Sequence, residues 1–392
     1  MTSNRAGRIA TAALVFLGVC GLGVGVTTNT SWATSVWTIS SSPNVPMSND
    51  YLRGVSCVSV VSCEAVGFRS GTSGTGANRT LVESWNGANW SVVPSKNPSS
   101  EGDSLSGISC TSSDFCMAVG EYSRGTSTDS PLHTLIESWN GSIWSVIPSP
   151  GVGASSSWLD GVSCVSVDSC TAVGGSPLHT LIESWNGTEW SVVRSPIPGR
   201  NGGALASVSC VAVSSCVAVG QYSGSITLTL IEAWDGTQWS QVSSPSVGPY
   251  GSYLNGVSCA SETSCQAVGY HQVGTGIASG DTRALIESWD GSRWSVVQTP
   301  RSNAANQLND VACTSTGSHC VAVGDYITSA SVERTLIESW DGTAWSTMSS
   351  PNIGSFDELA GVACPSLDHC KATGSSSNFT TFISRTLIES YG

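Results

Sequence analysis

The sequence predicts an all-β fold, a seven-bladed β-propeller of four-stranded antiparallel blades. A unit of 46 to 55 residues recurs along the chain, which is the period of propeller blades. Within each unit, short β-branched runs bounded by Gly, Ser and Asn indicate strands and not helices. The last unit lacks a fourth strand, and a matching segment occurs at the N-terminal end of the repeats. Together these observations predict a closed ring of blades.

Each unit contains four predicted strands, and units two and three illustrate them. The first strand has the pattern Leu-x-Gly-Val-Ser-Cys (159–164), and the second has Cys-x-Ala-Val-Gly (170–174). The third is Thr-Leu-Ile-Glu-Ser-Trp (134–139), followed by an Asn-Gly turn typical of a hairpin. The fourth begins at a second tryptophan, Trp144, and ends before Pro150, because proline cannot donate to the sheet.

The two ends of the chain predict how the ring closes. The seventh unit stops at Tyr391-Gly392, after its third strand. Trp37 and Pro43 have the spacing of Trp144 and Pro150, so residues 34–43 match a fourth strand. We expect this N-terminal strand to complete the last blade and to remove an exposed sheet edge.

Residues 1–33 are interpreted as a signal peptide, and residues 34–392 as a single propeller domain. Arg5 and Arg8 precede an apolar run over 9–26, and Ser31-Trp32-Ala33 offers a cleavage site. An uncleaved anchor is the alternative, because the apolar run is long enough to span a membrane. We therefore expect a secreted, extracellular protein, held at the cell surface if the segment is retained.

Fourteen cysteines form seven local pairs, which indicate a disulfide framework in an exported protein. Zinc is the alternative, but zinc sites favour closer pairs such as C-x2-C, so no metal site is assigned. The pairs are Cys57/Cys63, Cys110/Cys116, Cys164/Cys170, Cys210/Cys216, Cys259/Cys265, Cys313/Cys320 and Cys364/Cys370.

Composition limits the partners and the chemistry. Charged residues make up 11 % of the chain, the formal net charge is −13, and only two lysines occur. Nucleic-acid binding needs clustered Lys and Arg, so we expect no nucleic-acid partner. No nucleophile elbow, zinc-protease motif or phosphate-binding loop occurs in a suitable context, so we assign no cofactor and no catalytic residue. We expect a monomer.

The later part of each unit resembles the kelch repeat. Glu137-Ser138-Trp139-Asn140-Gly141-Ser142-Ile143-Trp144 is similar to the Glu-x-aromatic segment, turn and tryptophan of kelch units. Each unit has one glycine, as in Val119-Gly120, where kelch units have two, and its cysteine pair is not a usual kelch feature. The resemblance implies propeller architecture. It leaves function open, because kelch folds serve binding proteins and oxidases alike.

Two residue types recur in every unit, and both are interpreted as structural. We expect the repeated glutamate to be partly buried and hydrogen-bonded to backbone amides, because a catalytic carboxylate is not needed seven times. The tryptophan pairs are expected to pack between blades. The glutamates are Glu83, Glu137, Glu183, Glu232, Glu287, Glu338 and Glu389.

The loops after strands two and four emerge on one face, where propellers usually bind ligands, and the disulfide hairpins emerge on the other. Aromatic residues occur near these loops and suggest a sugar- or protein-binding surface, although they could instead cap the blades. They are Phe68, Tyr122, Tyr222, Tyr270 and Tyr326 after the glycine of strand two, and Tyr51, Trp158 and Tyr253 before strand one.

A second set precedes the third strand on the same face. These cations could bind carboxylates or sulfates of an anionic glycan, since guanidinium binds such groups bidentately. Alternatively, each arginine pairs with a neighbouring acid. The set comprises Arg79, His133, His179, Arg283, Arg334 and Arg385.

The leading functional hypothesis is a binding module for a glycan or a protein on the variable-loop face. A polysaccharide-acting enzyme, either a hydrolase, a lyase or an oxidase, is the alternative, with its site at the channel mouth. There the residue after the strand-one leucine varies, and Asp160 is its only acid, with Asp310 one position further on in another blade. These two blades lie nearly opposite in the ring, which disfavours a catalytic pair. A structural surface protein is the third hypothesis.

Overall fold

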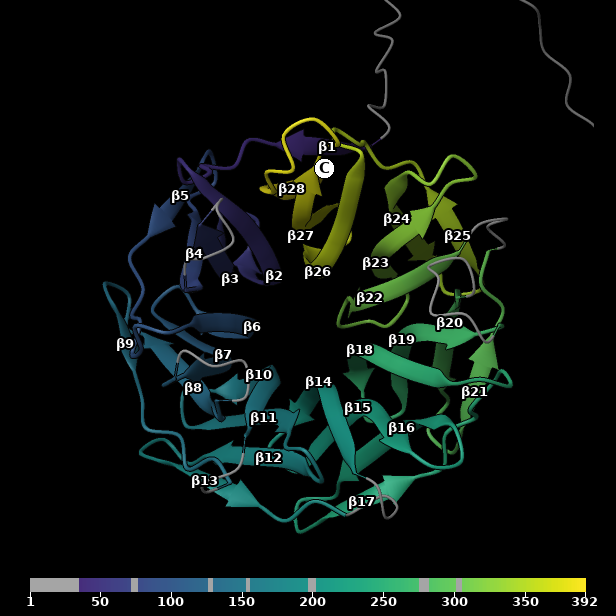
Figure 1. Ribbon diagram of the computed structural model, residues 1–392. Helices are drawn as coiled ribbons and strands as arrows, with labels where there is room; N and C mark the ends of the chain where they lie inside the picture. The colour runs from purple at the N-terminus through teal and green to yellow at the C-terminus, as the bar shows by residue number, and fades with distance from the viewer. Residues whose placement is uncertain are drawn as a thin grey trace, which may run out of the picture. The chain divides into compact units, whose positions relative to one another are not determined.

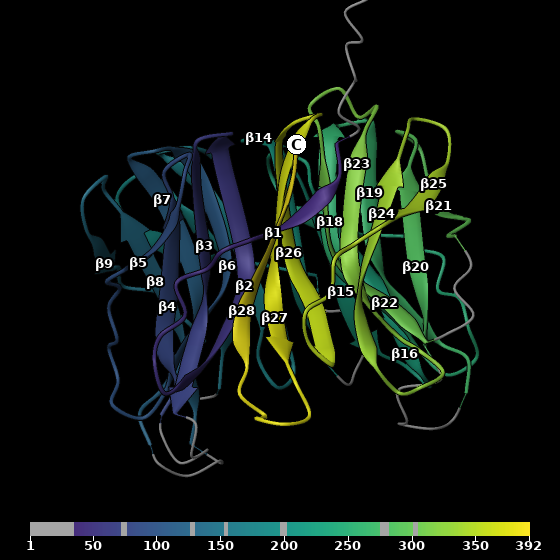
Figure 2. The same ribbon diagram turned by 90° about the horizontal axis from the view of Figure 1, so that it is seen from above.

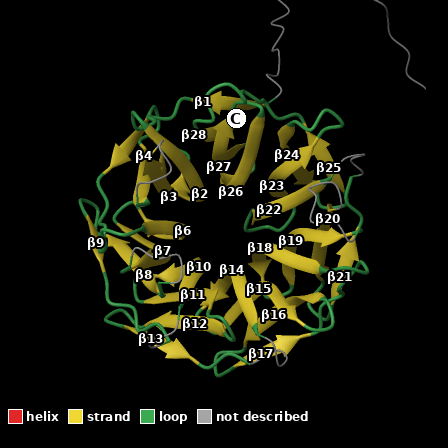
Figure 3. Cartoon of the chain, viewed as in Figure 1, coloured by secondary structure: helices red, strands yellow, loops and turns green. Residues whose placement is uncertain are grey.

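The computed structural model describes residues 35–71, 77–125, 130–152, 156–196, 202–274, 282–300 and 305–392. These residues form 28 β-strands, which make seven four-stranded blades. The blades are arranged in a ring (Figures 1 and 3). The expected fold class is therefore confirmed. None of the described segments is a helix long and apolar enough to cross a membrane. The expected signal peptide or anchor, residues 1–33, lies outside the described residues.

Successive strands form the blades in chain order, each an antiparallel meander. Blade 1 comprises β2 (Ser48–Ser59), β3 (Ser62–Gly71), β4 (Arg79–Trp85) and β5 (Trp90–Val93); blade 2 comprises β6 (Asp103–Ser112), β7 (Phe115–Ser123), β8 (Leu132–Trp139) and β9 (Trp144–Val146). Blade 3 comprises β10 (Trp158–Ser166), β11 (Ser169–Gly175), β12 (Thr180–Trp185) and β13 (Trp190–Val193). Blade 4 comprises β14 (Gly203–Ala212), β15 (Ser215–Ser223), β16 (Thr227–Trp234) and β17 (Trp239–Val242).

The remaining three blades follow the same order. Blade 5 comprises β18 (Ser252–Ser261), β19 (Ser264–Gln272), β20 (Thr282–Trp289) and β21 (Trp294–Val297). Blade 6 comprises β22 (Asn306–Cys313), β23 (Cys320–Ile327), β24 (Glu333–Trp340) and β25 (Trp345–Met348). Blade 7 comprises β26 (Phe356–Ser366), β27 (His369–Ser377), β28 (Arg385–Tyr391) and the N-terminal strand β1 (Trp37–Ser40).

The N-terminal strand closes the last blade, as the sequence predicts. β1 pairs antiparallel with β28, from Trp37 opposite Tyr391 to Ser40 opposite Ile388. The Trp37 ring is buried and lies 5.5 Å from the Tyr391 ring, centroid to centroid. Figure 2 shows the ring edge-on, with β1 lying across blade 7 beside β28. The two ends of the repeat region thus share one sheet.

The hydrophobic core is divided into seven clusters, each shared by two neighbouring blades. Between blades 2 and 3, for example, Met117 and Ile136 pack against Leu159 and Trp190. Between blades 7 and 1, Ile388 packs against Leu52. A blade therefore completes its core only through its neighbours, which is why a propeller must close.

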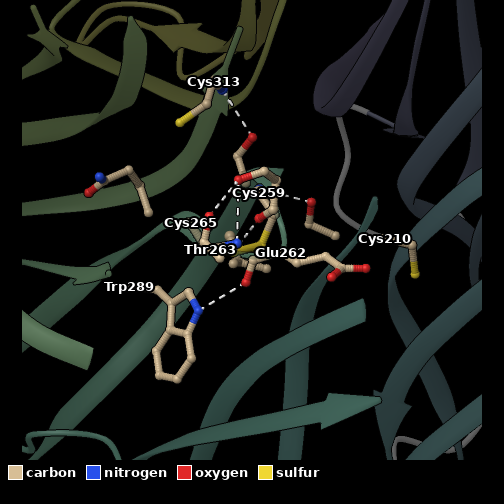
Figure 4. The surroundings of a disulfide bond; sticks show 12 residues. Cys210, Cys259, Glu262, Thr263, Cys265, Trp289 and Cys313 are labelled. Carbon is tan, nitrogen blue, oxygen red and sulfur yellow. Dashed lines mark hydrogen bonds between the residues drawn. A yellow bond between two sulfur atoms is a disulfide. The ribbon is translucent and has the colours of Figure 1, made fainter. Parts of the chain in front are cut away.

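The hairpin between strands one and two is held at the end of each blade by a disulfide and a tryptophan. All seven expected cysteine pairs are bonded, with Cα atoms 4.0–4.1 Å apart. In blade 5, Cys259 bonds Cys265, and the indole N–H of Trp289 donates to the Glu262 carbonyl at 3.1 Å (Figure 4). The disulfide also sets the strand register, because the two cysteines are direct partners in the ladder.

The two cysteines of each disulfide differ in burial. Cys63 and Cys116 are 2 % and 1 % exposed and belong to the hydrophobic core, whereas their partners Cys57 and Cys110 are only partly buried at its edge. Each second cysteine lies in strand two, whose side chains at this position face the preceding blade. These residues are therefore core residues and not part of an accessible surface site. The buried cysteines are Cys63, Cys116, Cys170, Cys216, Cys265, Cys320 and Cys370.

The seven repeated glutamates are fully buried between blades, but their partners differ from the expectation. Most accept a hydrogen bond from the serine that follows strand four of the preceding blade. Ser149 Oγ, for example, lies 2.8 Å from Glu183 Oε2 and also bonds Thr134. Backbone amides contribute in two cases, Lys96 N to Glu137 and Gly151 N to Glu183. Hydroxyl groups were not expected, because the serine is more than thirty residues away in sequence.

Candidate functional site

The central channel holds a cavity of about 730 Å³. The residue after the strand-one leucine lines it in every blade, as the sequence predicts; these residues are Arg53, Ser106, Asp160, Ala206, Asn255, Asn309 and Ala360. The ladder between strands one and two shifts register at this position in all seven blades. A bulge leaves one residue unpaired, so each side chain turns out of the sheet into the channel.

Close packing of the first strands explains the glycine after the bulge. A Cβ atom on Gly107 would lie 2.7 Å from the Asp160 carbonyl oxygen of the next blade. Blades 4 and 6 carry Ser207 and Asp310 instead, and both accept a hydrogen bond from a neighbouring blade, at Val257 N and Val362 N. Asp310 is thus bonded to blade 7 and is not a partner of Asp160.

Seven cross-strand pairs surround the mouth of the channel on the variable-loop face. Each joins the residue before the strand-one leucine to the residue after the strand-two glycine. The pairs are Tyr51/Phe68, Ser104/Glu121, Trp158/Gly175, Ala204/Gln221, Tyr253/Tyr270, Gln307/Asp325 and Glu358/Ser375. Unlike the buried residues of the blades, these positions differ in chemistry from one blade to the next.

Two of these pairs are stacked aromatic rings. The Tyr51 and Phe68 centroids lie 4.9 Å apart, and those of Tyr253 and Tyr270 lie 4.6 Å apart. All four rings are half-buried. The Arg53 guanidinium lies 5.3 Å from the Phe68 centroid, within cation–π range. Sequence reasoning identified these rings individually but missed that they form cross-strand pairs.

Blades 2 and 3 place two carboxylates near one another at the mouth. Burial raises the pKa of Asp160 to about 7, and the negative charge of Glu121 adds to this rise. The indole N–H of Trp158, which donates to Asp160 at 2.9 Å, acts to lower the pKa. Burial also raises the pKa of Glu121, and the positive charge of Arg53 opposes that shift. Trp158 therefore serves to position Asp160, a role that the sequence did not predict.

Blades 6 and 7 contribute a network of amides and carboxylates. Gln307 Nε2 donates to Asp325 Oδ1 at 3.0 Å, and Asn309 Nδ2 donates to the Leu359 carbonyl at 2.9 Å. Burial raises the pKa of Asp325 to about 6, with hydrogen bonds opposing the shift and the charge of Glu358 adding to it. The channel mouth is therefore acidic on both sides of its aromatic pairs.

Three of the expected ligand-binding aromatics are half-buried against the core. Tyr122, Tyr222 and Tyr326 pack against the clusters between blades 1 and 2, 3 and 4, and 5 and 6. They stand two residues after the strand-two glycine, whereas Phe68 and Tyr270 stand one residue after it. Adjacent residues of a strand point to opposite faces, so the five aromatic residues form two groups and not one.

Three of the four arginines before the third strand contact the next blade. Arg79 pairs with buried Asp103 at 3.1 Å, and Arg334 pairs with buried Asp357 at 3.4 Å. Arg385 donates to the carbonyls of Val45 and Ser48. In these blades the structure supports the alternative interpretation, in which each arginine stabilises the link between neighbours.

The residue before the third strand varies together with one position in the next blade. That position lies two residues before the leucine of strand one. Arginine occurs where that position holds Asp or Asn, and histidine or leucine occurs where it holds Ser or Gly. The combinations are Arg79/Asp103, Arg283/Asn306, Arg334/Asp357, Arg385/Asp50, His133/Ser157, His179/Gly203 and Leu228/Ser252. Among the others, His133 lies 5.2 Å from the Tyr122 ring, Arg283 donates to the Thr282 carbonyl, and His179 is exposed.

Within the described part of the chain, no group of three His, Cys, Asp or Glu side chains is placed to hold a metal ion. No protein-family model and no curated protein sequence matches the chain. The kelch resemblance therefore stays a similarity of motif.

Solved structures that resemble the chain are β-propellers. Ycf48 bound to a D1 peptide has a TM-score of 0.55 at 12 % identity, over 91 % of this chain and 96 % of that one. The WD40 repeats of RRP9 have a TM-score of 0.57 at 11 % identity, over 91 % and 98 %. Ycf48 from Cyanidioschyzon merolae has a TM-score of 0.53 at 12 % identity, over 91 % and 98 %. At these identities the likeness concerns the fold alone.

Proposed function

We propose that this propeller is a binding protein that holds a polypeptide segment with positive charge at the channel mouth of its variable-loop face. The observation that carries the proposal is the ring of seven cross-strand pairs, which vary in chemistry on an otherwise repeated scaffold. Stacked pairs such as Tyr253/Tyr270 offer apolar contact area to a ligand. Glu121 and Asp160, in blades 2 and 3, follow the Tyr51/Phe68 pair of blade 1 and offer carboxyl groups that carry negative charge once ionised.

Charge favours a basic polypeptide over the anionic glycan that the sequence suggested. The chain carries a formal charge of −13, and three of the four arginines before the third strand are bonded to the next blade. An acidic glycan would thus meet few free cations and several carboxylates. Among propellers of the same fold, Ycf48 has been solved bound to a D1 peptide.

We also propose that the protein works in an oxidising compartment outside the cytoplasm. Seven disulfides, one in each blade, support this, because such bonds persist mainly in exported proteins. Anchorage through residues 9–26 and secretion after cleavage are both compatible with this setting.

The proposal is tested by measuring binding of the purified protein to arrays of basic, neutral and acidic peptides and to acidic and neutral glycans, at low and high salt. We expect basic peptides to bind with an affinity that falls as salt rises. Glu121→Gln and Tyr270→Ala should weaken that binding. Tyr222→Ala should lower the stability of the fold but leave peptide binding unchanged. Acidic-glycan binding that is lost in Arg334→Ala would overturn the proposal.

A polysaccharide hydrolase at the same mouth is the second candidate function. It is favoured by the neighbouring carboxyls Asp160 and Glu121, since such enzymes use one protonated and one ionised carboxyl group. Release of reducing sugar from a polysaccharide panel, abolished by Asp160→Asn, would support it. Equal release by the wild type and Asp160→Asn would exclude Asp160 as its acid.

A further inference from the structure

The contact between blades 7 and 1 holds a lysine against a tryptophan. Lys371 follows Cys370 in β27, and its Nζ atom lies 4.2 Å from the centroid of the Trp85 ring in blade 1. The same Nζ donates to Ser390 Oγ of β28 at 2.7 Å. An ammonium group thus receives a cation–π contact from one blade and a hydrogen-bond acceptor from the other.

In three other blades the equivalent position holds a longer side chain, which bonds the third-strand serine or fills the space. Glu64 accepts a hydrogen bond from Ser84 at 2.6 Å. Gln266 donates to Ser288 at 3.0 Å. Met117 has an apolar side chain and is fully buried in the cluster between blades 2 and 3.

Blade 3 has the short residue Thr171 at this position, and a cleft of about 90 Å³ lies between blades 3 and 4. Thr171, Ser184 and Trp234 line it. These three residues are the equivalents of Lys371, Ser390 and Trp85. The indole N–H of Trp234 donates to the Val213 carbonyl at 3.2 Å, which fixes the orientation of the ring.

We propose that this blade 3–4 cleft binds the side-chain ammonium of a lysine from a partner polypeptide. The aromatic ring and the serine that receive Lys371 inside the molecule are both repeated here, while the chain supplies no lysine of its own. Its only lysines are Lys96 and Lys371. The formal charge of −13 favours the approach of a cationic group.

The cleft is a separate site from the channel mouth. Ser163 and Ser169 line it, and they flank the Cys164–Cys170 disulfide at the opposite end of the blade from the mouth. Variants of the cleft are therefore expected to leave binding of basic peptides at the mouth unchanged. The test of lysine binding in the cleft can therefore fail while basic-peptide binding at the mouth is confirmed, and the reverse also holds.

The first test uses n-butylammonium as a probe with the length and charge of a lysine side chain. We expect saturable shifts of the Trp234 indole N–H signal in ¹H–¹⁵N spectra of the full chain, with that signal assigned by its loss in Trp234→Phe. The neutral analogue n-butanol should bind roughly tenfold more weakly, because it lacks the cation–π contact and the charged hydrogen bond. Equal affinity for the two probes would overturn the proposal.

Two variants separate the cleft from unspecific amine binding. Thr171→Met should fill the cleft, as Met117 fills the equivalent space in blade 2, and should abolish the shifts while the near-UV spectrum stays native. Val217→Met, at the same position of blade 4, is the matched control and should retain them. A full response in folded Thr171→Met would contradict the proposal.

A third probe, Nα-acetyl-lysine methylamide, tests for a lysine carried by a polypeptide. Binding within a few-fold of n-butylammonium supports a chain-borne lysine. If this probe does not bind, the cleft accepts only small amines without a peptide backbone, and the assignment to a partner polypeptide is overturned.

Discussion

Individual residues between the blades show how a buried carboxylate is tolerated. Glu183 is fully buried, and Ser149 of the preceding blade donates a hydrogen bond to it at 2.8 Å. We expect Ser149→Ala to lower the free energy of unfolding by about 1–3 kcal/mol, because Glu183 then loses a donor in a dry environment. Urea denaturation of the variant and the wild type would measure the difference.

Thr299 provides the matched control for this prediction. It stands where the other blades have the serine, and blade 5 also has Ala284 where the others have threonine. Neither carboxylate oxygen of Glu338 in the next blade has a hydrogen-bond partner among the described residues. Thr299→Ala should therefore cost clearly less than Ser149→Ala. Equal costs would show that the Ser149 hydroxyl is not what stabilises the contact.

Glu338 itself should impose a pH dependence on stability. Burial raises its pKa from 4.5 to about 8. Because the folded-state pKa exceeds the unfolded one, its contribution is fully present below pH 4.5 and is lost as the pH rises through about 8. As the pH rises from 5 to 9, the free energy of unfolding should fall less in Glu338→Gln than in the wild type. Parallel stability curves for the two proteins would argue against this burial cost.

Arg334 distinguishes a structural from a ligand-binding role. Its guanidinium pairs with buried Asp357 and donates to the Gly354 carbonyl at 2.7 Å. Arg334→Ala should lower the melting temperature, because it leaves a buried carboxylate without its cation. The double variant Arg334→Leu/Asp357→Ser, which copies Leu228/Ser252, should recover part of the loss. No recovery would show that the two positions are not coupled.

At the scale of the elements, β1 determines whether blade 7 is complete. Trp37 is buried, and β1 covers an edge of β28 that would otherwise be open to other chains. Deletion of residues 34–43 should cause unfolding or aggregation, and Trp37→Ala should cost about 3–5 kcal/mol. Light scattering and thermal unfolding would measure both. A deletion variant that stays monomeric and keeps the wild-type melting temperature would refute this closure.

The elements were largely predictable because strand, turn and closure signals recur in nearly every unit. The spacing of Trp37 and Pro43 was enough to place β1, since it repeats Trp144 and Pro150. The bulge after Leu159 and its equivalents was not predictable, because it depends on how first strands pack around the channel. Local patterns specify a blade, whereas contacts between blades involve residues some fifty positions apart.

The candidate site was predictable only in part, for a related reason. The sequence placed variable residues and aromatics on one face, but Tyr222 and Tyr270 occupy positions of opposite parity and so face different surroundings. Asp160 was identified as the only acid in the channel ring, while Glu121, which influences its pKa, lies in another strand of another blade. Pairing across blades requires three-dimensional register, which a repeat pattern does not contain.

The molecule as a whole should be most stable in mildly acidic solution. Burial raises the pKa of Glu83, Glu137, Glu232, Glu287 and Glu389 from 4.5 to about 7. The stability that these groups contribute is fully present below pH 4.5 and is lost as the pH rises through about 7. Exposed turn residues act in the opposite direction. Hydrogen bonds lower the pKa of Asp290 and Asp341 from 3.8 to about 2, so their contribution is present above pH 3.8 and is lost as the pH falls through about 2.

Between these two effects, we expect a maximum of the melting temperature near pH 4–5 and a decline from pH 5 to pH 8. Calorimetry at constant ionic strength would measure the curve. Because the glutamates recur around the ring, replacing one of them with Gln should flatten the decline slightly and replacing several should flatten it in proportion. A melting temperature that rises from pH 5 to pH 8 would mean that the buried glutamates stay ionised, with the hydroxyl groups of the preceding blades fully compensating their burial.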